Sequence, residues 1–262
     1  MIKKISEKND SALMSSIESD IIDNKQTGEV NGGQETEGFG PMSYMLKREF
    51  KKLPHKNVPL NSNKLVAICA STGGPNALAK IIPKLPKDLN APVIMVQHMP
   101  SGFTDSMAKR LDEKSEITVT EAENGFKLRK GHMYIAKGGK HLSITGRRSG
   151  LYISLLDTPP RSGLRPCADI MFESLMKLDL DEIICVVLTG MGSDGTRGIG
   201  ELYEKKNVYV IAQDEKTSAV DGMPGMVRKA GLADEVLPLE AIADAITRVT
   251  GIKLSTDGNG GN

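Results

Sequence analysis

The sequence predicts an α/β fold: a doubly wound, mainly parallel sheet with helices on both faces and an inserted antiparallel β-hairpin. Between residues 64 and 252, short apolar runs alternate with stretches of helical periodicity. This alternation is typical of strand–helix–strand units, which build parallel sheets. One segment, 133–156, breaks the pattern with short alternating runs on both sides of Gly146-Arg-Arg-Ser-Gly150, which indicates a hairpin.

Strands are expected where apolar runs are bounded by turn residues, because such runs favour strands buried on both faces of a sheet. In chain order these runs lie at 65–69, 93–97, 117–120, 183–188, 208–212 and 235–237.

Helices are expected between the strands. They are placed at 76–82, 104–111, 168–178, 199–205, 223–230 and 239–249. The third of these shows the periodicity most clearly, since its apolar residues recur at helical spacing and form one stripe for burial. The stripe consists of Ala168, Met171, Phe172, Leu175 and Met176.

The two ends of the chain differ from the middle in composition. Residues 1–60 are polar and mixed in charge, which predicts a disordered, linker-like segment. Residues 61–252 are expected to form the folded domain. Residues 253–262 are rich in Gly and Asn and are expected to form a flexible tail.

Composition excludes several classes of function. The net charge of +1 and the absence of Trp argue against a nucleic-acid-binding protein. No apolar run is long enough to span a bilayer. Three scattered cysteines, Cys69, Cys167 and Cys185, predict buried, reduced thiols in a cytoplasmic protein. No paired-Cys or H-E-x-x-H pattern is present, so we expect neither a metal ion nor a cofactor.

The first apolar run ends at Ser71, in the turn Ala70-Ser-Thr-Gly-Gly-Pro75. A hydroxyl group on a tight strand-to-helix turn lies at the positive end of the following helix. Such a serine is a candidate nucleophile or part of an anion site. The alternative is a serine that only caps the helix.

Two further strands end in polar residues. His98 follows the run 93–97, and Asp194 lies in the glycine-rich turn after the run 183–188. Parallel sheets bind ligands outside the carboxyl ends of their strands. One sheet edge is therefore predicted to carry a hydroxyl, an imidazole and a carboxylate, which are the groups used in serine acyl transfer. The chain order Ser, His, Asp differs from that of α/β-hydrolases.

The glycines of this turn also allow a second interpretation. Gly190-Met-Gly-Ser-Asp-Gly195 fits G-x-G-x-x-G, and Asp214 follows the next strand at nearly the offset of a dinucleotide-binding fingerprint. This interpretation leaves the Ser71 and His98 turns unexplained. A dinucleotide-binding module stays open here as an alternative function.

Taken together, the motifs resemble the catalytic domain of chemotaxis protein-glutamate methylesterases of the CheB type, over roughly residues 64–250. The matching motifs are Ala70-Ser-Thr-Gly-Gly-Pro75, Gln97-His-Met-Pro-Ser-Gly-Phe-Thr104, Gly131-His-Met-Tyr-Ile-Ala136, Arg165-Pro166 with Asp169, Leu188-Thr-Gly-Met-Gly-Ser-Asp-Gly195 and Gly222-Met-Pro224.

The resemblance implies a serine hydrolase that removes methyl groups from glutamate esters of chemoreceptor helices and that also deamidates glutamines there. It implies Ser71 as nucleophile, His98 as general base and then acid, and Asp194 as the carboxylate that orients the ring. The remaining candidates are Thr72 and Met191 as active-site lining, with Met191 in the oxyanion hole, and Arg161 and Arg165 for the acidic receptor surface. A non-catalytic module that binds receptor helices is the other alternative.

The sequence departs from the family in two ways. Residues 1–60 are too few and too polar for the N-terminal receiver domain. Either this member lacks that domain or the sequence is truncated, and we expect hydrolysis that does not depend on a phosphodonor. Asp221 stands where an aromatic or apolar residue is expected. A carboxylate near the site would repel an acidic substrate.

Overall fold

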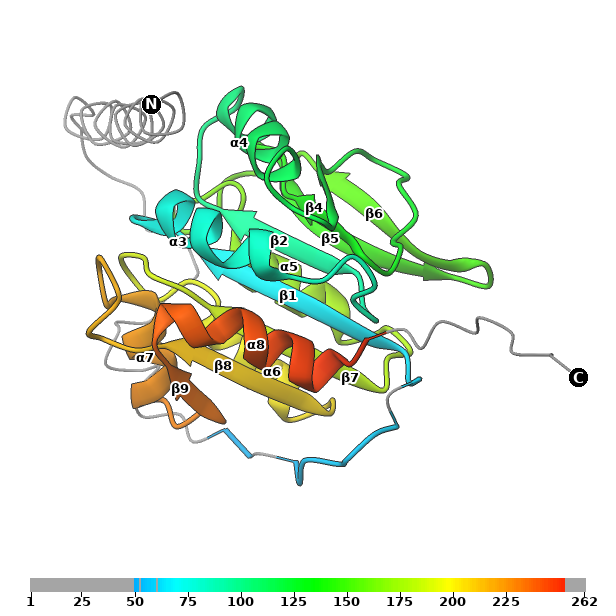
Figure 1. Ribbon diagram of the computed structural model, residues 1–262, viewed down its shortest axis with the longest axis vertical. Coiled ribbons are helices and arrows are strands. Elements are labelled where there is room, and N and C mark those ends of the chain that lie inside the picture. Colours follow the sequence, from blue (N-terminus) through cyan, green and yellow to red (C-terminus); the bar gives the residue numbers. More distant parts are fainter. Residues whose placement is uncertain (1–49, 52, 60, 253–262) are drawn as a thin grey trace, which may run out of the picture.

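A seven-stranded sheet forms the centre of the computed structural model, which describes residues 50–51, 53–59 and 61–252 (Figure 1). Its strands stand in the order β3-β4-β2-β1-β7-β8-β9, and each neighbouring pair is parallel. The bounds are β1 Lys64–Ala70, β2 Val93–Gln97, β3 Thr118–Glu121, β4 His132–Ile135, β7 Glu182–Val187, β8 Val208–Gln213 and β9 Glu235–Leu237. The parallel sheet predicted from the sequence is confirmed.

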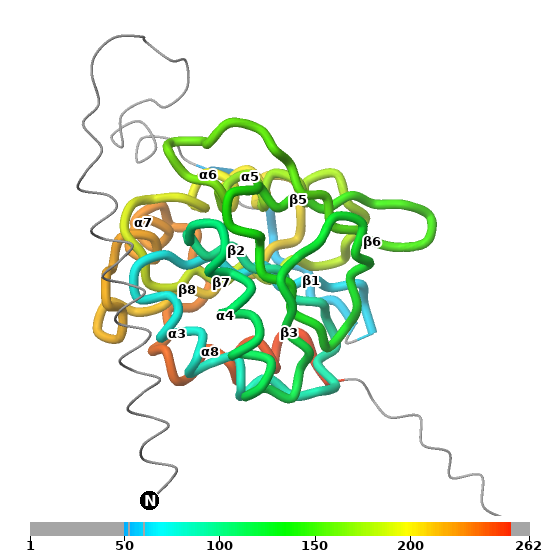
Figure 2. Tube along the Cα trace, turned by 90° about the horizontal axis from the view of Figure 1, so that it is seen from above, coloured from blue at the N-terminus to red at the C-terminus, as the bar shows by residue number. Residues whose placement is uncertain are grey.

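Helices cover both faces of this sheet, as Figure 2 shows from above. The first face carries α3 (Gly74–Ile81), the 3-10 turn η1 (Ile82–Lys84), α4 (Phe103–Asp112) and α8 (Leu239–Thr250). The second carries α5 (Ala168–Leu175), α6 (Thr196–Tyr203) and α7 (Met223–Lys229). The doubly wound arrangement is therefore also confirmed.

The central strands are apolar throughout because both of their faces are buried. In β1 the alternation of side chains divides the strand between two cores. Leu65, Ala67 and Cys69 belong to the core beneath α5, α6 and α7. The residues between them belong to the core beneath α3, α4 and α8.

Within the described residues, no helix is both long and apolar enough to cross a membrane.

The predicted hairpin is present but shorter than expected. It consists of β5 (His141–Arg147) and β6 (Gly150–Leu156), which pair antiparallel outside the main sheet. Ser174 of α5 accepts a hydrogen bond from the N–H of Ile144, so the hairpin is anchored on that helix. Its predicted start at residue 133 is wrong, because residues 132–135 form β4 within the main sheet.

Residues 50–59, from the segment predicted to be a linker, run along the domain wherever the structure describes them. Phe50 lies directly over Gly200 of α6, and the N–H of Leu53 donates to the carbonyl of Tyr203. His55 Nε2 lies 2.9 Å from a carboxylate oxygen of Glu182 at the start of β7. The other residues of 1–60, and all of 253–262, lie outside the described residues.

The direction of winding reverses between β1 and β7. From β1 the chain proceeds through α3 to β2 on one side, and from β7 it proceeds through α6 to β8 on the other. A reversal of this kind opens a crevice outside the carboxyl ends of the two strands, which is where open α/β sheets bind ligands.

Candidate active site

Ser71, His98 and Asp194 follow β1, β2 and β7 at this crevice. Backbone hydrogen bonds continue each strand pair just past its end. The N–H of Ser71 donates to the carbonyl of Thr189 at 3.0 Å, and the N–H of His98 donates to the carbonyl of Ala70 at 3.2 Å. The register of the sheet therefore brings the three loops together at one edge.

The imidazole and the carboxylate are in direct contact. His98 Nε2 lies 2.7 Å from Asp194 Oδ2, and the two side chains are only 7% and 6% exposed. Ser71 is 8% exposed. Among the described residues, no hydrogen bond joins Ser71 Oγ to the ring. Because Nε2 is held by Asp194, Nδ1 is the ring nitrogen left for the serine.

The carboxylate of Asp194, which belongs to the loop before α6, lies against the N-terminus of α5. It accepts hydrogen bonds from the N–H of Ala168 at 2.6 Å, the N–H of Asp169 at 2.9 Å and the thiol of Cys167 at 3.1 Å. Burial would raise the pKa of Asp194, but the hydrogen bond and charge of His98 and these N–H groups outweigh it and lower the pKa. The carboxylate is therefore kept ionised beside the ring.

Asp169 performs the reciprocal role for α6. Its Oδ1 accepts from the N–H of Gly195 at 3.0 Å and from that of Gly198 at 2.8 Å, so it fixes the loop that carries Asp194. Burial and the charge of Asp194 raise the pKa of Asp169 to about 7. The sequence interpretation quoted Asp169 only as part of a motif and missed this role. Its position in the first turn of a helix was the available signal.

The turn at Ser71 is fixed on both sides. The Ser71 carbonyl accepts from the N–H of Gly74 at 2.8 Å and from Gln97 Nε2 at 2.9 Å. Gly73 adopts φ 81° and so lets α3 begin directly after the serine turn. Gly190 lies against the serine, since a Cβ there would come within 2.8 Å of Ser71 Cβ. Gly190 and Gln97 were not predicted as site residues.

Thr72 and Met191 lie on the loops that flank the serine, and both are exposed, Met191 by 70%. Among the described residues, their backbone N–H groups donate no hydrogen bond. The carbonyl of Thr72 accepts from Thr189 Oγ1 at 2.9 Å, which ties the two loops together.

Arg161 and Arg165 both form ion pairs. Arg161 lies 2.5 Å from Glu173, a carboxylate that also pairs with Arg197. Arg165 pairs with Asp157 at 3.3 Å and donates to the carbonyl of Thr158. Ion pairs within the chain therefore partly neutralise the positive charge of both arginines.

Asp221 does not present an unpaired charge to the crevice. Its two carboxylate oxygens meet the two terminal nitrogens of Arg228 at 2.9 and 2.5 Å, which is a bidentate pair. Its backbone forms a bridge with Gly190, so the residue lies beside the serine loop. The expected repulsion of an acidic substrate is offset by the paired guanidinium.

Among the described residues, one group of side chains has the spacing of a metal site: ligand atoms of Cys167, Asp169 and Asp194 lie within 4.8 Å of one another. The carboxylate oxygens of both aspartates, however, already accept the N–H bonds described above. Burial and the charge of Asp194 raise the pKa of Cys167, which favours a thiol donor over a thiolate ligand. The group therefore suits hydrogen bonding.

The dinucleotide interpretation depends on Asp214 as the ribose-binding acid. In the structure its carboxylate accepts from the N–H of Thr217 at 2.9 Å and from the hydroxyl of the same residue at 2.6 Å. Asp214 therefore closes the turn after β8, which is the ordinary use of an aspartate in a turn.

The family described as CheB methylesterase matches residues 66–246. The chain belongs to the CheB methylesterase family. This result confirms the resemblance seen in the motifs.

Named relatives of this CheB-family chain are protein-glutamate methylesterase/protein-glutamine glutaminases. The protein from Geobacillus kaustophilus is 48% identical over 187 residues, which is 71% of this chain and 54% of the relative. The Bacillus subtilis protein is 48% identical over 194 residues, or 73% of this chain and 54% of the relative. The chain thus spans about half the length of these curated relatives.

The fold of the CheB-family chain also matches a solved structure. The crystal structure of the Thermotoga maritima CheB methylesterase catalytic domain is 42% identical in sequence, with a TM-score of 0.68. The match covers 72% of this chain and 99% of that domain.

Proposed function

We propose that this chain is a protein-glutamate methylesterase that hydrolyses glutamate methyl esters on chemoreceptor helices through Ser71, His98 and Asp194. The contact of 2.7 Å between His98 and the buried Asp194, at a sheet edge shared with Ser71, supports this most directly. Its membership of the CheB family supports the choice of substrate.

In the proposed reaction, His98 Nδ1 takes the proton of Ser71 as the hydroxyl oxygen attacks the ester carbonyl. Asp194 holds the opposite ring nitrogen, fixes the tautomer and stabilises the imidazolium that forms. The Ser71–His98 hydrogen bond forms when substrate closes the site, since such bonds are often long in enzymes without ligand.

Attack places negative charge on the carbonyl oxygen, and the unoccupied N–H groups of Thr72 and Met191 are the proposed donors to it. The intermediate collapses as His98 gives its proton to the departing methanol, which leaves a Ser71 ester. Water, activated by His98, then hydrolyses that ester and releases the glutamate carboxylate.

The same steps would deamidate a glutamine, with ammonia leaving in place of methanol. The names of the relatives, methylesterase and glutaminase together, support this second activity. The proposed catalytic unit is residues 61–252, and Arg161 and Arg165 are proposed to contact the acidic receptor surface. The three free, buried cysteines favour work in a reducing cytoplasm.

The test is methanol release from methylated chemoreceptor membranes. Ser71→Ala is expected to lower the rate by about 10³-fold or more, with the fold intact by circular dichroism. Ser149→Ala, at the turn of the β5–β6 hairpin, is the matched control and is expected to retain the wild-type rate. Full activity of Ser71→Ala would refute the nucleophile, and absence of methanol with the wild-type protein would refute the activity.

A further inference from the structure

A basic pocket of about 530 Å³ lies at the opposite edge of the sheet from the catalytic crevice. Its wall includes Asn63 and Pro92, which directly precede β1 and β2. The hairpin turn between β5 and β6 and the residues after α5 complete it. We call it the hairpin pocket. Its charged lining residues are Lys127, Lys130, Arg147, Arg148, Lys177 and Asp179.

The hairpin pocket concentrates positive charge in a chain whose net charge is only +1. Five of its lining residues are cationic and one is acidic. Within the part of the chain that the structure describes, Lys127, Arg148 and Lys177 form no ion pair, and all three are exposed. Such a concentration of unpaired charge attracts an anionic partner.

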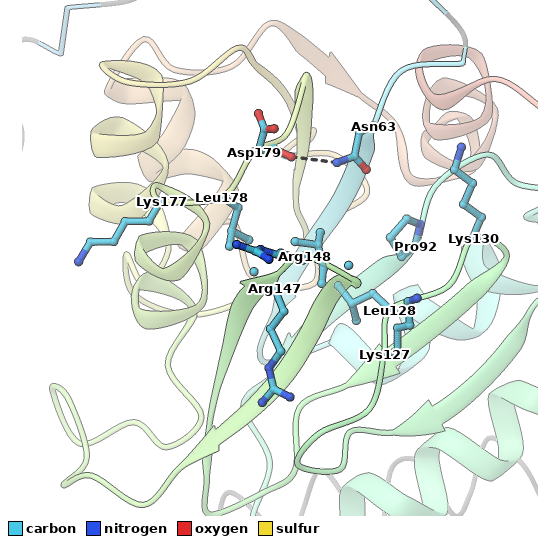
Figure 3. Close-up of a pocket in the computed structure, with 13 residues that line it drawn as sticks. Asn63, Pro92, Lys127, Leu128, Lys130, Arg147, Arg148, Lys177, Leu178 and Asp179 are labelled. Carbon is cyan, nitrogen blue, oxygen red and sulfur yellow. Dashed lines mark hydrogen bonds between the residues drawn. The ribbon is translucent and has the colours of Figure 1, made fainter.

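The shape of the hairpin pocket favours an extended partner over a compact one. Figure 3 shows Arg148 across its middle beside Leu178, with Lys177 directed outward at one end and Lys130 at the other. The cations do not converge on a single point, as they would around one phosphate. The buried residues Leu128 and Leu178 add an apolar floor. None of the lining residues is aromatic, so stacked nucleic-acid bases find no platform.

The combination of a cationic rim and an apolar floor in the hairpin pocket fits an acidic polypeptide that also carries apolar side chains. Such a segment occurs in the chain itself. Residues 9–37 contain seven carboxylate side chains and one lysine, and Leu13, Met14, Ile17 and Ile21 lie among the first of those carboxylates. The charge and the apolar content of this segment are complementary to the rim and the floor of the hairpin pocket.

The place where the described chain begins makes the contact reachable. Phe50 lies on α6, and α6 neighbours α5, whose following residues line the hairpin pocket on the same face of the sheet. The twelve residues 38–49 could bridge up to about 40 Å when extended.

We propose that the hairpin pocket binds residues 9–37 of the same chain. The contact joins the N-terminal segment to the edge of the domain remote from Ser71. It goes beyond the proposed catalysis and does not depend on it.

The test is zero-length carbodiimide crosslinking of the full chain, followed by peptide mapping. We expect amide bonds from Lys127 or Lys177 to carboxylates of residues 9–37 in the monomeric fraction. Lys109 and Asp105, 2.7 Å apart on α4, provide an internal standard for the reaction. Sodium chloride at 0.5 M is expected to weaken the pocket crosslinks, because it screens exposed charges.

Arg148→Glu is the test variant, because it reverses a central charge and leaves both reporter lysines in place. It is expected to lower the pocket crosslinks about two- to fivefold, as for the loss of one or two exposed ion pairs. Lys80→Glu, on α3 at the other face, is the matched control and is expected to leave them unchanged. The proposal is overturned if the standard forms without pocket crosslinks, if these appear only between two copies, or if Arg148→Glu leaves them unchanged.

Discussion

At the residue scale, two buried aspartates hold each other's helices. Asp194, from the loop before α6, accepts from the N-terminus of α5, while Asp169 of α5 accepts from the N-terminus of α6. Each carboxylate thereby satisfies backbone donors that a helix start leaves open. These reciprocal hydrogen bonds hold the Asp194 carboxylate in place, in hydrogen-bonding contact with His98.

Asp194→Asn tests the role of the charge in this arrangement. The amide can still accept from one side, but it cannot stabilise an imidazolium and it favours the wrong ring tautomer. We expect kcat for methanol release to fall by about 10²–10⁴-fold with little change in KM. Steady-state kinetics on methylated receptor membranes measures this. A variant with near wild-type kcat would exclude the orienting role.

The raised pKa of the Asp169 carboxyl group predicts that the stability of the fold depends on pH. Its folded pKa of about 7 lies above that of an unfolded aspartate. As pH rises from about 4 to 7, the unfolded chain therefore loses this proton while the folded chain keeps it, and the free energy of unfolding falls. Asp169→Asn removes that proton while its side-chain oxygen can still accept from Gly195 and Gly198.

We therefore expect Asp169→Asn to gain stability relative to the wild type between pH 5 and pH 8, by on the order of one to a few kcal/mol. Urea unfolding at the two values measures the difference. The charged groups around Asp169, namely Asp194, Arg197 and Glu173, are present in both proteins, so the comparison changes only the carboxyl at position 169. A difference independent of pH would show that Asp169 is ionised throughout.

At the element scale, the ends of β1 and β7 approach so closely that only glycine fits at 190. A Cβ there would clash with Met223 Sδ and lie 2.8 Å from Ser71 Cβ. Gly190→Ala must therefore displace α7 or the serine turn. We expect a loss of about 1–3 kcal/mol in the free energy of unfolding and a clear loss of methanol release.

Gly146→Ala is the matched control for that substitution. Its new Cβ meets Leu178 Cδ2 at 3.4 Å and Leu151 Cδ2 at 4.0 Å, both ordinary van der Waals contacts, and it lies on the hairpin away from the crevice. Activity should be retained there. Equal losses in the two variants would mean that the fit of Gly190 against Ser71 has no special importance.

The elements predictable from the sequence were those with long apolar runs or a clear helical stripe. The strand over 93–97 is found with the expected bounds, and the helix starting at Ala168 was placed correctly but ends at Leu175. The strand β4 was missed. Its four residues are too few to show a period, and they adjoin the alternating segments of the real hairpin.

The same reasoning explains which parts of the site were foreseeable. Polar residues that follow parallel apolar strands must meet at one edge of the sheet, and this rule predicts from the sequence that Ser71, His98 and Asp194 lie together. The position of Asp169 in the first turn of α5 was a signal for hydrogen bonds to backbone N–H groups, but its partners on α6 depend on how the two helices approach each other in space.

At the scale of the whole molecule, the two edges of the sheet carry different sets of polar side chains. The carboxyl edge carries Ser71, His98 and Asp194, and the carboxylate of Asp221 beside them is paired with Arg228. The opposite edge carries the hairpin pocket with its excess of cations. In the proposed arrangement, the N-terminal segment occupies the hairpin pocket and the crevice is left free for substrate.

We propose that residues from three separate strand ends act as one catalytic unit. The most direct measurement compares methanol release by Ser71→Ala, His98→Ala and the double variant. Residues that act as a unit are not additive, so the double variant should be no slower than the slower single variant. If the two losses multiply instead, Ser71 and His98 act independently and the proposed triad is contradicted.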